Sequence, residues 1–176
     1  QNVIISGCRF LDFEVFSLRE DKNESTPVIG FSSDDFNGDI ESKNTIPLGE
    51  VLNRVNNFAF QAPTPNVNDP MFIHIRIKTS QQKDNNGNEI GIDNSIYEKV
   101  KKIIDTNLSV NRYSGKVNGK TKISNIMGKY VVIIDKGLID TKNPEILKNM
   151  NTYNLQSNSQ TLRSYRNSII LKEKYI

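Results

Sequence analysis

The sequence predicts an α/β fold with a largely parallel sheet. Runs of aromatic and β-branched residues alternate along the chain with segments of helical periodicity, an order typical of βα units. The 176 residues include 36% apolar and 24% charged residues, ordinary fractions for a globular protein. Their number is sufficient for one domain with its own core, so we expect residues 1–176 to form a single domain.

The first half of the chain predicts two strands and a helix. Residues 8–16 are rich in aromatic residues, and a period of two places Asp12 and Glu14 on one face of this strand. Residues 27–31 are expected to form a second short strand. Pro47 suits a first helical turn, and the helix is expected to end near Phe60. Its apolar stripe consists of Leu48, Val51, Leu52, Val55 and Phe58.

Strict alternation makes residues 71–78 the clearest strand. A helix follows at residues 94–107, and another strand at residues 130–135. Near the end of the chain the pattern indicates a short helix after Pro144 and a strand at residues 168–171. In the strand of residues 71–78, one face carries Ile73, Ile75 and Ile77, and the other carries Phe72, His74, Arg76 and Lys78.

Composition excludes several classes of protein. Cys8 is the only cysteine, so neither an intrachain disulfide nor a cysteine-based zinc site can form. The net charge of +3 comes without a block of like charges, which argues against a nucleic-acid arm. The first residues lack the pattern of a signal peptide, and no apolar stretch has the length of a transmembrane segment. We therefore expect an intracellular or virion-associated protein.

Several motifs, in matching order and spacing, resemble the X region of phosphatidylinositol-specific phospholipases C. They are Gly-Cys-Arg-Phe-Leu-Asp-Phe-Glu at residues 7–14, Pro-Val-Ile at 27–29, Ile-Pro-Leu-Gly-Glu-Val-Leu at 46–52 and Asn-Phe-Ala-Phe at 57–60. The resemblance extends from about Ile4 to Lys136. It implies a partial or complete barrel of the triosephosphate isomerase type, with sites at the carboxyl ends of the strands. It also implies further strands before Gln1 and after Lys136, so we expect a domain that is incomplete at both ends, with residues 137–176 beyond the similarity.

The resemblance implies chemistry that this chain lacks. Related phospholipases use two histidines as base and acid. The position that matches the second one is Phe31, which cannot transfer a proton, and the single histidine, His74, lies on another strand. His74 and Arg76 are the candidate catalytic residues if the chain is active. The alternative for His74 is a buried histidine with satisfied hydrogen bonds.

The family's calcium positions are also changed. Two acidic ligands match Asp12 and Glu14, but the third matches Arg76, whose charge repels a metal ion. We therefore predict an ion-pair cluster of Arg76 with Asp12 and Glu14 and no cofactor; calcium held by the two carboxylates is the alternative. Bacterial relatives replace the metal with arginine, so this change alone does not exclude catalysis. The basic residues that contact phosphate in the family match Ile133 and Asp135 here, which is a further departure from the family's pattern.

Two further motifs are excluded. Residues 115–121, Gly-Lys-Val-Asn-Gly-Lys-Thr, are one residue short of a phosphate-binding loop and follow no strand. Residues 84–88 place their glycine wrongly for a calcium loop and lack the closing glutamate. Arg9 and Lys78 are expected to stabilise strand ends rather than to bind phosphate.

Three functions stay open at this point. The first is an inactive phospholipase-like barrel with a structural or binding role and protein partners. The asparagine-rich composition of this chain resembles that of proteins from large DNA viruses. This resemblance suggests a virion component, such as a minor capsid or internal protein. The alternative is an active phosphodiesterase for phosphoinositides or other phosphodiesters, with its missing residues outside this chain. A phosphate- or headgroup-binding module without turnover is a third reading.

Overall fold

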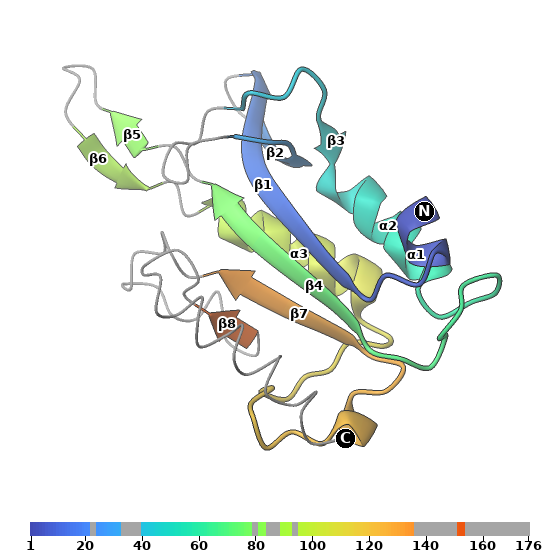
Figure 1. Cartoon of the computed structure of the whole chain (residues 1–176). Helices are drawn as coiled ribbons and strands as arrows, with labels where there is room; N and C mark the ends of the chain where they lie inside the picture. Colours follow the sequence, from blue (N-terminus) through green and yellow to red (C-terminus); the bar gives the residue numbers. More distant parts are fainter. Residues whose placement is uncertain are drawn as a thin grey trace.

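A single large sheet organises the described part of the chain (Figure 1). The computed structural model describes residues 1–21, 24–32, 40–78, 81–83, 89–92, 95–135 and 151–153. Within these residues, six strands form the sheet in the order β3-β2-β1-β4-β7-β8, and β5 and β6 form a separate ribbon. The strands are β1 (Phe10–Asp21), β2 (Glu24–Ile29), β3 (Ile46–Pro47), β4 (Met71–Lys78), β5 (Gln81–Lys83), β6 (Glu89–Ile92), β7 (Tyr130–Asp135) and β8 (Asn151–Tyr153).

The sheet is mixed and open, so the predicted largely parallel arrangement and the predicted barrel of the triosephosphate isomerase type, partial or complete, are both wrong. The pairs β1–β4, β4–β7 and β7–β8 are parallel, but β2 is antiparallel to β1, and β3 to β2. In the described residues β3 and β8 end the strand order and do not pair. A crossover between parallel strands needs a dozen or more residues, whereas β1 ends at Asp21 and β2 begins at Glu24. The chain therefore folds back as a hairpin, and β2 pairs antiparallel with β1 on the side away from β4.

The two long predicted helices are confirmed, with bounds that differ by one or two residues. They are α2 (Leu48–Phe58) and α3 (Ser95–Leu108), and both pack on the same face of the sheet. The short helix α1 (Asn2–Ile5) lies beside α2, and a single 3₁₀ turn, η1 (Ile123–Asn125), precedes β7 (Figure 1).

Strands β4 and β7 have the predicted bounds, whereas β1 and β2 extend further toward each other. The polar residues that separate the two predicted strands therefore belong largely to the arms of the hairpin. The helix expected after Pro144 and the strand expected at residues 168–171 lie outside the described residues.

The period of two in β4 divides its side chains between two environments. Ile73, Ile75 and Ile77 are buried against the helices, as predicted. This main core also includes Leu52 of α2 and Ile104 of α3, both fully buried. The opposite face of the sheet carries a smaller apolar cluster and a group of charged residues; the apolar cluster consists of Ile126, Val131 and Ile133, with Phe72, Tyr113 and Val117 packed against it.

Candidate functional site

Charged side chains gather on the face of the sheet opposite α2 and α3. The parallel register of β1 and β4 pairs Asp12 with His74 and Glu14 with Arg76. Lys78 follows two residues later on the same face of β4. We call these five residues, Asp12, Glu14, His74, Arg76 and Lys78, the ion-pair cluster.

Arg76 is the centre of the ion-pair cluster. Its Nε and Nη2 donate to Oδ1 and Oδ2 of Asp12, both at 3.1 Å. Its Nη1 donates to Oε1 of Glu14 at 2.7 Å. Such a two-pronged contact matches the planar guanidinium to the carboxylate and is among the stronger ionic hydrogen bonds in proteins. The ion pairs predicted for Arg76 are therefore present.

Glu14 is nearly inaccessible, with 8% of its surface exposed, and has partners on both oxygens. Besides Arg76, Oε1 lies 3.8 Å from Nζ of Lys78, which is itself 1% exposed. Oε2 accepts the backbone N–H of Ser32 at 3.2 Å. A buried carboxylate is tolerated when it is paired and hydrogen-bonded, so Lys78 and Ser32 complete the set of partners that Glu14 needs at this depth. The sequence pattern placed Lys78 on this face but did not indicate the contribution of Ser32.

His74 contacts the ion-pair cluster through one ring nitrogen. Its Nδ1 lies 3.0 Å from Oδ1 of Asp12, and 4% of its side chain is exposed. Its Nε2 is buried and has no hydrogen-bond partner among the described residues. The ring of Phe10 lies 6.3 Å away, centre to centre. The described residues therefore supply a hydrogen bond for Nδ1 of His74 and none for Nε2.

These contacts set the protonation of Asp12. Burial tends to raise the pKa of its carboxyl, but hydrogen bonds with His74 and Arg76, together with their charge, hold that pKa below its usual value. Asp12 is thus an acceptor throughout the neutral range.

The carboxylates do not fit calcium. Calcium requires six to eight oxygen ligands. All four carboxylate oxygens of Asp12 and Glu14 already accept hydrogen bonds from Arg76, His74 or Ser32. The guanidinium of Arg76 also bonds to both carboxylates at once, where its charge opposes that of a cation. In the described residues, no group of three or more His, Cys, Asp or Glu side chains is arranged to hold a metal.

The described side chains at the other positions named from the resemblance are not arranged for catalysis. Phe31 is 57% exposed just beyond β2, and Ile133 is buried in the smaller apolar cluster. Asp135 ends β7, and its side chain lies outside the description. Arg9 donates to the carbonyl oxygens of Ala59, Pro65 and Asn66, so it stabilises a loop beside the start of β1, as predicted.

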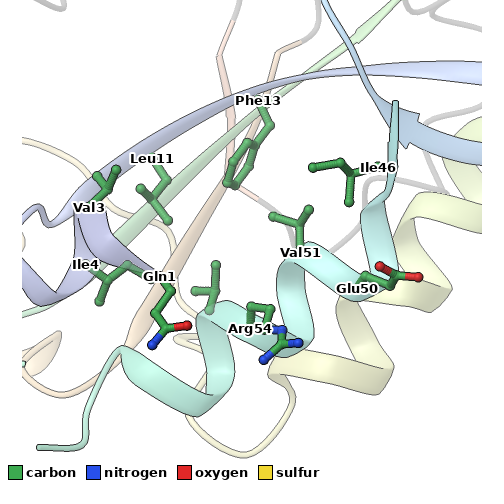
Figure 2. Close-up of a pocket in the computed structure, with 10 residues that line it drawn as sticks. Gln1, Val3, Ile4, Leu11, Phe13, Ile46, Glu50, Val51 and Arg54 are labelled. Atoms are coloured by element: carbon green, nitrogen blue, oxygen red, sulfur yellow. The ribbon is translucent and has the colours of Figure 1, made fainter. Parts of the chain in front are cut away.

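A separate groove of about 410 Å³ lies on the helix side of the sheet. Figure 2 shows Leu11 and Phe13 of β1 pointing into it, opposite Val51 of α2, with Glu50 and Arg54 on either side of Val51 along the helix. Because Leu11 and Phe13 alternate with Asp12 and Glu14, this apolar groove opens on the other face from the ion-pair cluster.

Comparisons with known proteins place no further residue in a site. No model of a known protein family matches the chain, and no curated protein matches it significantly. None of the helices in the described residues has the length and apolar character needed to cross a bilayer.

Proposed function

We propose that this chain is a catalytically inactive relative of the phosphatidylinositol-specific phospholipases C with a structural or binding role, such as that of a virion component. The observation that carries the proposal is the engagement of both carboxylates by the protein itself. Every oxygen of Asp12 and Glu14 accepts a hydrogen bond from another residue of the chain. These bonds, and the charge of Arg76, oppose the use of either carboxylate to hold a metal or to take a proton from a substrate.

Charge balance also supports a structural role. Arg76 and Lys78 offset Asp12 and Glu14 within the ion-pair cluster, and Glu14 and Lys78 are almost wholly buried. A phosphodiester needs positive charge that is free to stabilise it in the transition state. Here the guanidinium of Arg76 uses three of its donors on the protein's own carboxylates. The cluster is therefore suited to holding β1 against β4.

One observation favours the alternative, an active phosphodiesterase. Nδ1 of His74 donates its hydrogen to Asp12, so in the neutral ring Nε2 carries the lone pair. Nε2 has no hydrogen-bond partner among the described residues. An aspartate that orients a histidine in this way is a common arrangement for a general base. The second histidine of the family would have to come from residues outside this chain, because His74 is the only histidine in it.

An assay of the longest natural form of the protein separates the two functions. Hydrolysis of phosphatidylinositol and of a soluble inositol phosphodiester is measured with and without calcium, for the natural sequence and for His74→Gln and Arg76→Ala. The inactive reading predicts no turnover in any sample and a lower melting temperature for Arg76→Ala. Turnover that His74→Gln abolishes, while the fold is retained, would replace the proposal with the alternative.

A further inference from the structure

Positive charge is concentrated in the segment that joins α3 to β7. Residues 111–129 contain one arginine, four lysines and no acidic residue. The whole chain has a net charge of +3, so this segment carries more positive charge than the chain as a whole. Arg112 pairs with Asp105 of α3. Lys116, Lys120 and Lys122 are exposed, and no described acidic side chain forms an ion pair with them.

The same segment displays apolar side chains to solvent. Ile123 is 68% exposed and Met127 is 38% exposed. Val110, at the start of the connection, is 89% exposed. Apolar side chains in the same segment as exposed lysines are the composition of an interfacial membrane contact.

The connection is a folded element, so these exposures follow from its conformation. Ile126 is 3% exposed and packs with Val131 and Ile133 of β7, and Val117 packs against the same cluster. In the turn between them, the backbone N–H of Asn118 donates to Oγ1 of Thr121 at 2.9 Å. The segment therefore buries one set of apolar side chains and directs another set outward.

The connection packs on the same face of the sheet as the ion-pair cluster. Val117 and Ile126 lie against the smaller apolar cluster with Ile133, which is in register with His74. In Figure 1 the connection runs below β7, and the backbone N–H of Met71 bonds to the carbonyl of Lys129, just before β7 begins. Arg76 and Lys78 lie farther along β4, toward its carboxyl end.

We propose that residues 110–129, which we call the basic loop, form a docking surface for an anionic lipid bilayer. Lysines attract the negative headgroups, while Ile123 and Met127 enter the boundary between headgroups and acyl chains. A nucleic acid would use the same charges but would leave these aliphatic side chains in water. Single-stranded nucleic acids are held largely by stacking on exposed aromatic rings, and the basic loop has only Tyr113, which is half-buried.

Vesicle flotation tests the proposal with the whole chain. Vesicles of phosphatidylserine and phosphatidylcholine are compared with vesicles of phosphatidylcholine alone. Each lysine near an anionic surface strengthens binding about fivefold. Lys120→Gln/Lys122→Gln should therefore weaken binding to the anionic vesicles by more than about tenfold. The matched control is Lys43→Gln/Lys102→Gln, which removes two exposed lysines outside the basic loop and should change binding little.

A second variant tests the apolar contribution. Ile123→Ser/Met127→Ser should reduce binding even at high salt, where the lysine attraction is screened. Circular dichroism checks that each variant is folded. Equal binding to both kinds of vesicle, equal losses in the loop variant and its lysine control, or binding of a random-sequence oligonucleotide without binding of vesicles would each overturn the proposal.

Discussion

Removing the guanidinium of Arg76 is the most direct test of what the ion-pair cluster does. Arg76→Ala deletes two hydrogen bonds to Asp12 and one to Glu14. Glu14 stays buried, with Lys78 at 3.8 Å and the N–H of Ser32 as its remaining partners. Asp12 can recover hydration, because 42% of its side chain is exposed. Most of the lost stability therefore comes from Glu14.

The size of the effect follows from these exposures. Breaking a buried ion pair by removing one partner costs about 3–5 kcal/mol. The side chain of Arg76 is 25% exposed, and Lys78 partly compensates Glu14, so we expect the lower end, about 3 kcal/mol. For a chain of this length that loss lowers the melting temperature by roughly 6–12 °C. The pair with Asp12 adds only about 0.5 kcal/mol, as exposed pairs do.

Chemical denaturation of three variants measures this effect. Lys101→Ala breaks the exposed pair with Asp105 on α3 and serves as control, with an expected loss of about 0.4 kcal/mol. Glu14→Gln in the Arg76→Ala background should restore part of the stability, because it removes the uncompensated charge. An Arg76→Ala loss no larger than that of Lys101→Ala would refute the reasoning that the cluster stabilises the sheet.

Three more predictions follow from individual side chains. The pKa of Asp12 is lowered from 3.8, so the stability that its carboxylate contributes is present above that pH and is lost as the pH falls through the lower pKa of the folded state. Acid titration of the free energy of unfolding should therefore show a loss below about pH 4, and this loss should be absent from Asp12→Asn. Leu52→Ala should cost about 2–4 kcal/mol in urea denaturation because Leu52 is fully buried, whereas the exposed neighbour in Asn53→Ala should change stability by less than about 0.5 kcal/mol. Burial raises the pKa of Tyr130 to about 12, and its hydroxyl donates to Asn56 at 3.1 Å, so ultraviolet titration should show a late-ionising tyrosine that is absent from Tyr130→Phe. The corresponding stability is present below the ordinary tyrosine pKa of 10.0 and is lost as the pH rises toward 12.

Local patterns predicted most helices and strands of this chain because each pattern depends only on residues a few positions apart in the sequence. The alternation in residues 71–78 defined β4 and divided its side chains between the core and the ion-pair cluster. The apolar stripe that begins at Leu48 predicted α2. The same reasoning placed Asp12 and Glu14 on one face, and the charge of Arg76 was enough to predict their pairing.

The pattern could not establish how the strands are arranged. Residues 27–31 were read as a separate strand in a series of βα units, although the short interval after β1 permits only a hairpin. The direction of β2 depends on the length of the connection, whereas apolar alternation is the same in parallel and antiparallel strands. The barrel expectation came from the resemblance and not from a local pattern. It is wrong because β2 and β3 join the sheet antiparallel and the sheet stays open.

The sequence by itself determined which residues can ionise, which faces are apolar and where the main helices and strands lie, because these follow from side-chain chemistry and period. Only the tertiary structure decided which groups meet. It brought the backbone N–H of Ser32 to Glu14, left Nε2 of His74 without a hydrogen-bond partner in the described residues, and exposed Ile123 while burying Ile126. Such contacts depend on the register between distant segments, which no local pattern encodes.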